Sequence, residues 1–436
     1  MHTTKELAMF LKKKGFIYQS SEIYGGVAGL YDYGHLGTRL KKNFENVWRN
    51  YFLELNDNFH EIETAQIMHK DVFKGSGHLE NFADPVLYCS KCDFSERADH
   101  FVEKVVGKRV EELSTGELND LITKEGAVCP QCKAGFKPIE EMNMMFPLDM
   151  GVGGGQIAYL RPETAQSPYV NFKLQYEMLR KKLPLGLALI GRAFRNEISP
   201  RNLTLRQREF TQAELQIFFN PTLIEKHPDF ESVKEYKLRV MLCDDRDEGH
   251  VKERTAAELV EQLLPQFYVY HLVKIQQFYL DVLGVSADKF RLYQLNENEK
   301  AFYNKFHFDL EVEMAEHGWV EVGGLHYRTD HDLKGHQTVS KEKMEVYDEE
   351  TATKFIPHVL ELSFGVDRNV YGLLDLNYED HERGNVVLHL PSSVVPFTCA
   401  VFPLVKNKPG LVETARDVYN ALRKEFSCLY DQASSV

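Results

Sequence analysis

The segment of residues 185–219 constrains the fold more strongly than any other part of the chain. Two stretches with the character of β-strands, residues 185–198 and about 206–219, are separated by a short polar loop near residues 199–204. A loop of this length joins antiparallel neighbours, so we expect the two strands to pair in one sheet. Side chains alternate between the faces of a strand, and one face of the second strand therefore carries Phe210, Gln212, Glu214 and Gln216.

The charged residues of this strand pair suit a nucleotide. Arg195 and Glu197 share one face of the first predicted strand, and Arg206 and Phe210 follow in the second. A guanidinium binds phosphate oxygens in a planar geometry, and an aromatic ring stacks on a base. Taken alone, the pattern fits a pair of amphipathic strands with a solvated charged face equally well.

A strand that runs directly into a helix adds a further arginine. In residues 358–365, apolar side chains alternate with Glu361 and Ser363, which therefore share the opposite face. Arg368 follows in the first helical turn, where the helix dipole disfavours a cation. A bound phosphate would explain this placement, whereas an incidental surface arginine is the alternative.

Two Cys-x-x-Cys pairs predict a zinc site. The seven cysteines of the chain include Cys89, Cys92, Cys129 and Cys132, which form two short knuckles. Zinc in structural sites takes four thiolate or imidazole ligands in a tetrahedron, and four thiolates leave no open position for catalysis. The long interval between the pairs must hold a small fold of its own. Four reduced cysteines without a metal are the alternative.

Length and composition set the broad class. The chain has 436 residues, which predicts two to four domains. It contains no apolar stretch of the length that a membrane-spanning helix needs, and its first residues lack the layout of a secretory signal. We therefore expect a cytoplasmic protein that has no part in a membrane. A net charge of −13 argues against nonspecific nucleic-acid binding over the whole surface.

The two arginine-bearing patterns together resemble motifs 2 and 3 of the class II aminoacyl-tRNA synthetases. Motif 2 is an Arg-x-Glu strand, a loop and a second strand, and motif 3 is a Gly-x-x-Arg corner, here residues 365–368. Further segments are similar to the dimeric glycyl-tRNA synthetases, from about residue 5 to the end. They are Gly29-Leu30-Tyr31-Asp32-Tyr33-Gly34, Arg161-Pro162-Glu163-Thr164-Ala165-Gln166, residues 194–199 and residues 208–214.

The resemblance implies an α+β fold with an antiparallel sheet flanked by helices. It implies a catalytic core in residues 1–87, 138–220 and 306–384, a zinc-binding insertion in residues 88–137, a helical insertion in residues 221–305, and an α/β anticodon-binding domain in residues 385–436. Residues 396–436 match only the first part of that domain, so we expect it to be incomplete. Residues 40–68 resemble the dimer-forming motif 1 but lack its usual proline, and a homodimer is expected.

The resemblance also implies two reactions at one site. The glycine carboxylate attacks the α-phosphate of ATP to give glycyl-adenylate and pyrophosphate, and the glycyl group then passes to the 3′ end of tRNA(Gly). The catalytic residues would be Arg195 and Arg368. The ATP-binding residues would be Arg195, Asn196, Glu197, Leu205, Arg206, Phe210, Glu321, Val322, Gly365 and Arg368. Magnesium would bind with ATP at Glu321 and, as the weaker candidate, at Glu361.

Glycine selection would depend on carboxylates and on limited space. The family's positions assign glycine to Arg97, Glu163, Phe210, Gln212, Glu214, Glu361 and Ser363. The carboxylates would hold the ammonium group, and Ser363 would fill the space that a side chain needs. A pocket rejects a larger amino acid by overlap, so a tight glycine pocket needs no editing.

Three other readings remain open at this point. The first is a class II synthetase for serine, proline or threonine, against which residues 161–166 and the carboxylates favour glycine. The second is a non-catalytic paralogue that binds RNA or a protein, which would be expected to lose Arg195, Glu197 or Arg368. The third is a zinc-ribbon nucleic-acid binder with a scaffold domain, which the acidic charge disfavours.

Overall fold

A large mixed sheet organises the protein. The structure is a computed structural model that describes residues 2–107, 110, 113–153, 155–262, 264–301, 303–349, 351–380 and 386–433. Within these residues, nine strands pair in the order β13-β12-β14-β15-β16-β19-β11-β10-β3. The pairing is antiparallel except between β10 and β3 and between β12 and β14. The strands are β3 (Phe59–Glu61), β10 (Leu185–Phe194), β11 (Glu209–Phe219), β12 (Lys237–Met241), β13 (Lys252–Thr255), β14 (Phe290–Gln294), β15 (Phe306–Met314), β16 (Gly318–Thr329) and β19 (His358–Gly365).

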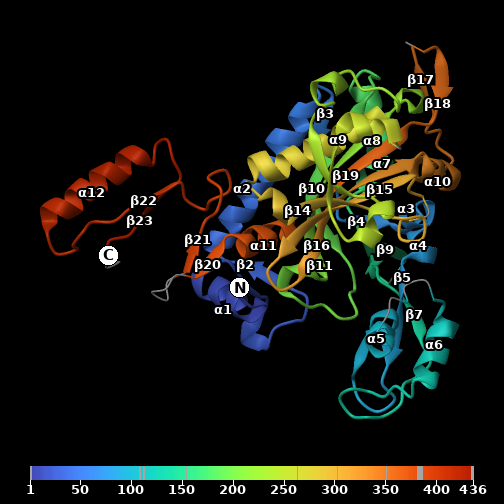
Figure 1. Cartoon of the computed structure of the whole chain (residues 1–436), viewed down its shortest axis with the longest axis horizontal. Coiled ribbons are helices and arrows are strands. Elements are labelled where there is room, and N and C mark those ends of the chain that lie inside the picture. Colours follow the sequence, from blue (N-terminus) through green and yellow to red (C-terminus); the bar gives the residue numbers. More distant parts are fainter. Residues whose placement is uncertain are drawn as a thin grey trace.

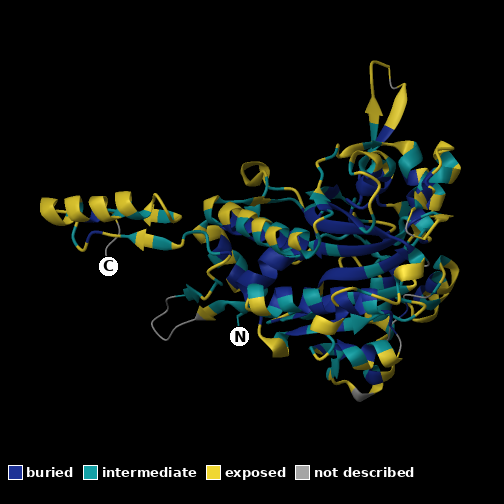
Figure 2. Ribbon diagram, turned by 90° about the horizontal axis from the view of Figure 1, so that it is seen from above, coloured by how far each residue is buried: buried dark blue, intermediate teal, exposed yellow. Residues whose placement is uncertain are grey.

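Helices cover both faces of this sheet (Figure 1). On one face, α1 (Thr4–Lys14), α2 (His35–Phe52), α8 (Ala256–Gln262), α9 (Gln266–Gln277) and α11 (Val366–Leu376) share a core with alternate strand residues. On the other face, α7 (Gln166–Met178) and α10 (His331–Ser340) pack over a smaller core. Figure 2 shows the most buried residues concentrated along the sheet between these layers.

Strand alternation decides which residues face the functional site. In β11, the odd-numbered residues from Ala213 to Phe219 are buried, and Ala213, Leu215, Ile217 and Phe219 belong to the larger core. In β19, Leu360, Leu362 and Phe364 lie in the same core. The predicted polar set of β11, and Glu361 and Ser363 of β19, therefore point to the opposite face. This part of the prediction is confirmed.

The insertion that is predicted to bind zinc has its own core. Strands β5 (Ala83–Tyr88), β6 (Ser95–Arg97) and β7 (Glu140–Asn143) form a small sheet in the order β6-β5-β7. Helices α5 (Ala98–Val106) and α6 (Thr115–Lys124) pack on it. The buried side chains include Leu87, Phe101, Val102 and Leu118. The insertion projects from the body of the molecule (Figure 1).

The segment of residues 221–305 is only partly helical. It contains the expected helices α8 and α9, but β12, β13 and β14 extend the main sheet, and these strands were not predicted. The charged residues of β12 and β13 hid their strand character, because Leu238 and Val240 alternate with Lys237 and Arg239. The segment therefore belongs structurally to the core sheet as well as to the helical layer.

Smaller elements complete the described chain. The remaining strands are β1 (Ile17–Gln19), β2 (Tyr31–Tyr33), β4 (Ile67–His69), β8 (Phe146–Met150), β9 (Gln156–Leu160), β17 (Val346–Asp348), β18 (Thr353–Phe355), β20 (Tyr378–Asp380) and β21 (Val386–Leu388). Short helices are α3 (Lys70–Gly75) and α4 (His78–Asn81). Short 3₁₀ helices are η1 (Glu22–Tyr24), η2 (Leu53–Leu55), η3 (Leu203–Leu205), η4 (Pro221–Leu223), η5 (Phe230–Ser232), η6 (Cys243–Glu248) and η8 (Ala287–Lys289), and η7 (Phe278–Val282) is a π-helical segment that follows α9.

The C-terminal unit stands apart from the body (Figure 1). Strands β22 (Cys399–Val401) and β23 (Cys428–Tyr430) pair in parallel and are connected through α12 (Pro409–Leu422). On α12, Ala415 is buried, whereas Leu411 and Val418 are exposed. The predicted domain boundary between residues 384 and 385 lies outside the described residues.

Among the described helices, none has the length and apolar character needed to cross a bilayer.

Candidate active site

A cleft opens on the polar side of strands β11, β16 and β19. The space inside it, counted together with the open solvent at its mouth, is about 620 Å³. Most of the residues predicted to bind ATP line it, together with Gln212 and Ser363 from the predicted glycine set. The lining residues are Arg195, Glu197, Thr204, Leu205, Arg206, Gln207, Phe210, Thr211, Gln212, Glu321, Val322, Gly323, Ser363, Gly365, Asp367 and Arg368.

Arg195 lies just beyond the end of β10 and not on the strand. The prediction that Arg195 and Glu197 share a strand face is wrong, because β10 ends at Phe194 and only the Arg195 N–H still bonds to the neighbouring chain, at the Arg208 carbonyl. The Arg195 Nε donates to the carbonyl oxygen of Pro162 at 3.0 Å. Its guanidinium lies 5.3 Å from the ring centroids of both Phe82 and Phe210. The side chain is thus held between two rings, beside the ring predicted to stack on adenine.

The loop after Arg195 brings an acid and a base together. Arg206 Nε lies 3.1 Å from the Glu197 carboxylate, and the backbone carbonyl of Glu197 accepts from Arg208. Asn196 is held by its backbone N–H, which donates to Met144, and its side chain is not among the lining groups of the cleft. Burial lowers the pKa of Arg206, although Glu197 favours its charged form. Both charges remain available at the wall of the cleft.

Arg368 faces the same cleft from the first turn of α11. Its Nε donates to the carbonyl oxygen of Leu205 at 3.0 Å. Its Nη1 donates to the backbone carbonyl and to the carboxylate of Glu321, at 3.0 and 3.1 Å. Glu321 is more than half exposed, so its carboxylate is accessible from the cleft. Val322 and Gly365 line the cleft beside this pair.

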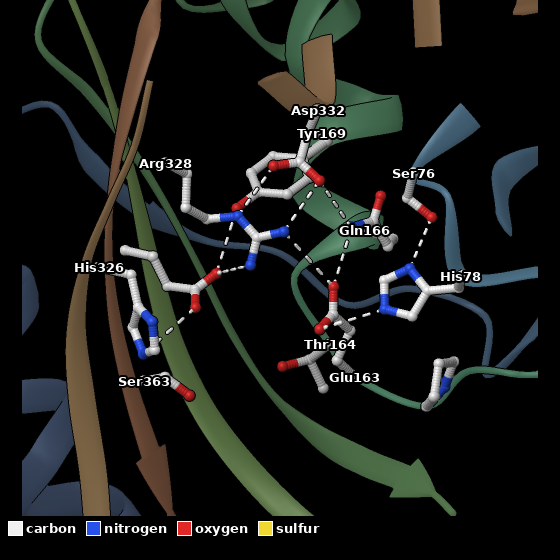
Figure 3. A network of polar contacts seen from close by, with 12 residues as sticks. Ser76, His78, Glu163, Thr164, Gln166, Tyr169, His326, Arg328, Asp332 and Ser363 are labelled. Carbon is white, nitrogen blue, oxygen red and sulfur yellow. Dashed lines mark hydrogen bonds and ion pairs between the residues drawn. The ribbon is translucent and has the colours of Figure 1, made fainter. Parts of the chain in front are cut away.

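A buried polar network continues below the cleft (Figure 3). Ser363 donates from its hydroxyl to Glu214 at 2.9 Å, and the Gln216 amide donates to the other Glu214 oxygen at 3.3 Å. Gln212 accepts from the backbone N–H of Thr164 at 3.1 Å. The register places Glu214 directly opposite Ser363. The predicted glycine residues of β11 and β19 therefore lie next to one another.

Glu361 is held by donors on three sides. Its carboxylate accepts from Gln216 at 2.8 Å, Tyr169 at 3.1 Å and Arg328 at 3.3 Å. It is 4% exposed and is not among the lining groups of the cleft. This environment separates it from the phosphate-facing residues. The geometry therefore favours Glu321 over Glu361 for magnesium.

Glu163 closes the network on its far side. Its carboxylate accepts from the Gln166 amide at 2.8 Å and lies 3.5 Å from His78 Nε2. His78 is in turn hydrogen-bonded through Nδ1 to the Ser76 hydroxyl at 2.7 Å. Arg328 Nη2 lies 3.9 Å from Glu163. Figure 3 shows His78 and Arg328 on two different sides of this carboxylate.

The carboxylates of the network differ in their affinity for protons. Burial, reinforced by Glu361 and Glu163, raises the pKa of Glu214 to about 8. Burial also raises the pKa of Glu361, against the effect of Arg328. For Glu163, burial is outweighed by His78 and Arg328, which hold its pKa below the usual range. The network therefore contains a strong and a weak acid side by side, a pattern typical of functional sites.

Arg97 approaches the site from the zinc-binding insertion. It ends β6 and is bound to Asp99 through Nε at 3.0 Å and to Asp84 at 3.2 Å. The neighbouring Glu96 and the backbone of Ser95 face the loop after β10 through Arg201 and Ser199. Arg97 is not a lining residue of the cleft. The insertion thus contacts the loop that carries Glu197, but its arginine is occupied by acids of its own region.

The four cysteines of the predicted zinc site converge. Their sulfur atoms all lie within 4.8 Å of one another, and they are the metal-ligating cluster found among the described residues. The Cys89–Cys132 and Cys92–Cys129 sulfurs are 3.4 and 3.6 Å apart. A tetrahedral zinc with bonds of about 2.3 Å requires separations of roughly 3.8 Å. The donor set and its geometry therefore fit zinc.

Sequence reasoning missed Arg328 and His78. Arg328 is buried and donates to Asp332 at 2.8 and 2.9 Å in addition to Glu361. It lies two residues after His326, which pairs with Glu361, and it reaches the same carboxylate although the β16–β19 ladder is irregular between Tyr327 and Thr329. His78 lies in a short helix whose contact with Glu163 depends on tertiary packing, and no local pattern could have indicated it.

Comparison with known proteins identifies the family. No family model matches the chain. Glycine–tRNA ligase of Pyrococcus abyssi is 37% identical over 506 aligned positions that cover 98% of this chain and 88% of the relative. The chain belongs to the glycine–tRNA ligase family. Further members are the glycine–tRNA ligases of Aeropyrum pernix, 33% identical over 98% of this chain and 86% of the relative, and of Methanothrix thermoacetophila, 31% identical over 97% and 86%.

A solved structure supports the fold of this glycine–tRNA ligase family member. The threonyl-tRNA synthetase RNA-binding domain of Cryptosporidium parvum superposes with a TM-score of 0.56 and 17% identity, covering 99% of this chain and 84% of that one. At this identity the likeness concerns the fold alone. The predicted fold class, with an antiparallel sheet flanked by helices, is confirmed.

Proposed function

We propose that the chain is a glycine–tRNA ligase that activates glycine with ATP and transfers it to the 3′ end of tRNA(Gly). Family membership supports the reaction. The observation that carries the proposal for the site is that Arg195, Phe210 and Arg368 line one cleft. Ser363 lines the same cleft, and its hydroxyl donates to the Glu214 carboxylate. A nucleotide site thus adjoins a small, acidic pocket.

The proposed first step needs no side-chain nucleophile. One oxygen of the glycine carboxylate attacks the α-phosphorus of ATP, the bond to the bridging oxygen breaks, and pyrophosphate leaves. Arg195 would bind the α-phosphate and the glycine carboxylate, and would stabilise the charge that develops between them. Phe210 would stack on adenine, and Glu197 would accept from its amino group. Asn196 and Leu205 would contribute to ATP binding chiefly through their backbone positions.

The remaining charges would hold the leaving group. Arg206 and Arg368 would bind the β- and γ-phosphates, with Val322 and Gly365 beside them. Magnesium, which bridges phosphate oxygens and takes one or two carboxylates, would bind at Glu321. Catalysis would then rest on positioning and electrostatics.

Glycine would bind with its ammonium group among the carboxylates. The carboxylates of Glu163, Glu214 and Glu361 would hold it beside Ser363, whose hydroxyl donates to Glu214, and Gln212 and Arg97 would contribute at the border of the glycine site. Burial, together with Glu361 and Glu163, raises the pKa of Glu214 to about 8, and a bound ammonium group would favour the ionised carboxylate. In the second step, the terminal ribose hydroxyl of tRNA attacks the carbonyl carbon of glycyl-adenylate, and AMP leaves.

We propose that zinc, coordinated by Cys89, Cys92, Cys129 and Cys132, stabilises the insertion. Four thiolates close the coordination sphere, so the metal would serve structure only. The small core of the insertion supports this role, because a domain of this size gains much of its stability from a metal. The proposed reaction also implies a cytoplasmic location, together with the machinery of protein biosynthesis.

A homodimer is proposed on the evidence of one apolar stripe. On α7, Val170, Leu174 and Met178 recur every fourth residue and are 37, 53 and 64% exposed. Ile67 of the motif 1-like segment is also exposed, and the start of α7 contacts its neighbour Met68. A second copy covering this stripe would continue the interface that motif 1 implies. Sedimentation equilibrium should give twice the chain mass, and Leu174→Asp should reduce it to one.

The decisive experiment is amino-acid-dependent exchange of labelled pyrophosphate into ATP. Glycine should support exchange, whereas alanine, serine and proline should support little. Exchange with serine and none with glycine would favour a synthetase for another small amino acid. A folded chain with no exchange for any of these would favour the non-catalytic reading. Charging of tRNA(Gly) tests the second step separately.

A further inference from the structure

The glycine- and tyrosine-rich segment of residues 29–34 has no role in the proposed chemistry, yet it reaches the back of the ATP cleft. Tyr33 in β2 donates from its hydroxyl to Asp367 Oδ1 at 2.6 Å. Lys41 of α2 donates to the same oxygen at 2.8 Å and to the Thr211 hydroxyl at 2.7 Å. The Thr211 backbone N–H donates to the second oxygen of Asp367. We call Tyr33, Lys41, Thr211 and Asp367 the aspartate cluster.

The aspartate cluster joins three parts of the fold that the ATP site depends on. Asp367 directly precedes Arg368 in the first turn of α11, and Thr211 directly follows Phe210 in β11. The Thr204 hydroxyl also donates to the Asp367 backbone carbonyl at 3.3 Å. Helix α2 packs against α11, β11 and β2 in this region (Figure 1). The cluster therefore fixes the distance between the predicted phosphate and adenine contacts.

The cluster is buried and its charges are matched. Lys41 is 8% exposed and Asp367 is 2% exposed. The Lys41 ammonium also lies 4.7 Å from the centroid of the Tyr33 ring. An aspartate in the first helical turn is favoured by the helix dipole, in contrast to Arg368 one residue later. A buried charged pair is retained only with good geometry and full hydrogen bonding, and this geometry specifies one position of the helix start.

The glycines of the segment allow Tyr33 to reach this position. A Cβ atom on Gly34 would lie 2.3 Å from the backbone oxygen of Gly15, so the backbones approach too closely for any side chain. Gly29 has a φ of +77°, and a Cβ there would lie 2.6 Å from Pro200 in the loop after β10. The carbonyl of Gly29 accepts from Arg208 at 2.8 Å. The segment is thus held between α1 and the loop that bears Arg206.

We propose that Tyr33, Lys41 and Asp367 are positioning residues for Arg368, and that they set its location relative to Phe210 for binding the triphosphate of ATP. This inference rests on the proposed function and adds residues to it. Their loss should weaken ATP binding and leave glycine binding unchanged, because the carboxylates of the glycine site are held by Arg328, Gln216 and His78, and none of the hydrogen bonds within the described part of the chain joins them to the cluster.

The test uses two pairs of variants that differ by a single group. Tyr33→Phe removes only the hydroxyl that binds Asp367, and Tyr31→Phe is its control, since Tyr31 lies two residues earlier in the same strand and packs on the same core. Thr211→Val removes the hydroxyl that Lys41 binds, and Thr211→Ser keeps it. Full-length proteins are compared by calorimetric binding of magnesium-ATP, by the KM values of pyrophosphate exchange, and by thermal unfolding.

Tyr33→Phe and Thr211→Val should each raise the Kd and KM for ATP about three- to tenfold, a size expected for one hydrogen bond to a charged network. The KM for glycine should change less than twofold, and Tyr31→Phe and Thr211→Ser should behave as wild type. Equal losses for ATP and glycine, or unchanged ATP binding in both variants, would overturn the inference. Failure of the wild type to exchange with glycine, while the ATP-binding differences persist, would instead refute the proposed function.

Discussion

Ser363→Ala tests the origin of glycine selection. Ser363 lies opposite Glu214 on β11 and opposite Gly324 on β16, so three strands border the space predicted for the glycine α-carbon. Its hydroxyl donates to Glu214 at 2.9 Å. The substitution has two separable effects: it removes the donor that orients a carboxylate, and it vacates about the volume of a hydroxyl group.

The two effects differ in size and in selectivity. Loss of a hydrogen bond to a charged group costs about 1.5 kcal/mol or more, so the kcat/KM of adenylate formation should fall about tenfold for any amino acid. The vacated volume relieves only alanine, by about 1 kcal/mol out of the roughly 1–3 kcal/mol that one methyl group is worth in a pocket. The ratio of glycine to alanine efficiency should therefore fall about fivefold.

The assay is pyrophosphate exchange with glycine and alanine over a range of concentrations. Ser363→Thr is the matched control, because it keeps the hydroxyl and adds a methyl group, and its glycine-to-alanine ratio should not fall. Thermal unfolding of both variants checks that the fold is kept. An unchanged ratio in Ser363→Ala would refute the assignment of Ser363 to the wall of the pocket.

Three further predictions concern charge, pH and metal. Arg368→Ala should raise the KM for ATP about 10- to 100-fold, the value of a hydrogen bond between charged groups, and a comparable rise for glycine would contradict the assignment. Burial next to Glu361 and Glu163 raises the pKa of Glu214 to about 8. Between pH 4.5 and about 8, the folded chain therefore keeps a proton on this carboxyl that the unfolded chain loses. Glu214 thus lowers the free energy of unfolding progressively over this pH range. Glu214→Gln should therefore gain free energy of unfolding relative to wild type as pH rises from 5 to 8 in urea titrations, and a constant difference would be the opposing result. Metal analysis should find one zinc per chain. Cys129→Ser should lose this zinc and make residues 88–137 accessible to protease, since structural zinc contributes roughly 10–16 kcal/mol in small domains. Equal protease resistance of the variant and the wild type would argue against a structural metal.

Local patterns allowed prediction of those parts of the site that depend on strand alternation and helix starts. The two-residue period of β11 and β19 placed Glu214 and Ser363 on one face, and the corner before α11 placed Arg368 in the first turn. Both predictions depend only on residues that are close in the sequence, and the structure confirms both placements. The cysteine pairs were equally readable, because each knuckle is local and only their meeting requires the fold.

The other parts of the site and fold could not be predicted from the sequence, because they depend on which strands pair in the tertiary structure. The role of Arg328 becomes visible only once β16 is known to pair with β19. That pairing sets His326 opposite Glu361 and brings Arg328 to this carboxylate, 33 positions away in the sequence. Arg195 was assigned to a strand because nothing in the local sequence shows that β10 ends one residue earlier, at Phe194. The strands of residues 221–305 were missed because their charges resembled those of exposed helices.

The most direct measurement is a crystal structure of the chain with a non-hydrolysable glycyl-adenylate analogue. The adenine should stack on Phe210, the group that replaces the phosphate should contact Arg195, and the ammonium should lie among Glu163, Glu214 and Glu361. An analogue bound away from these residues, or a glycyl group directed into open solvent, would contradict the account.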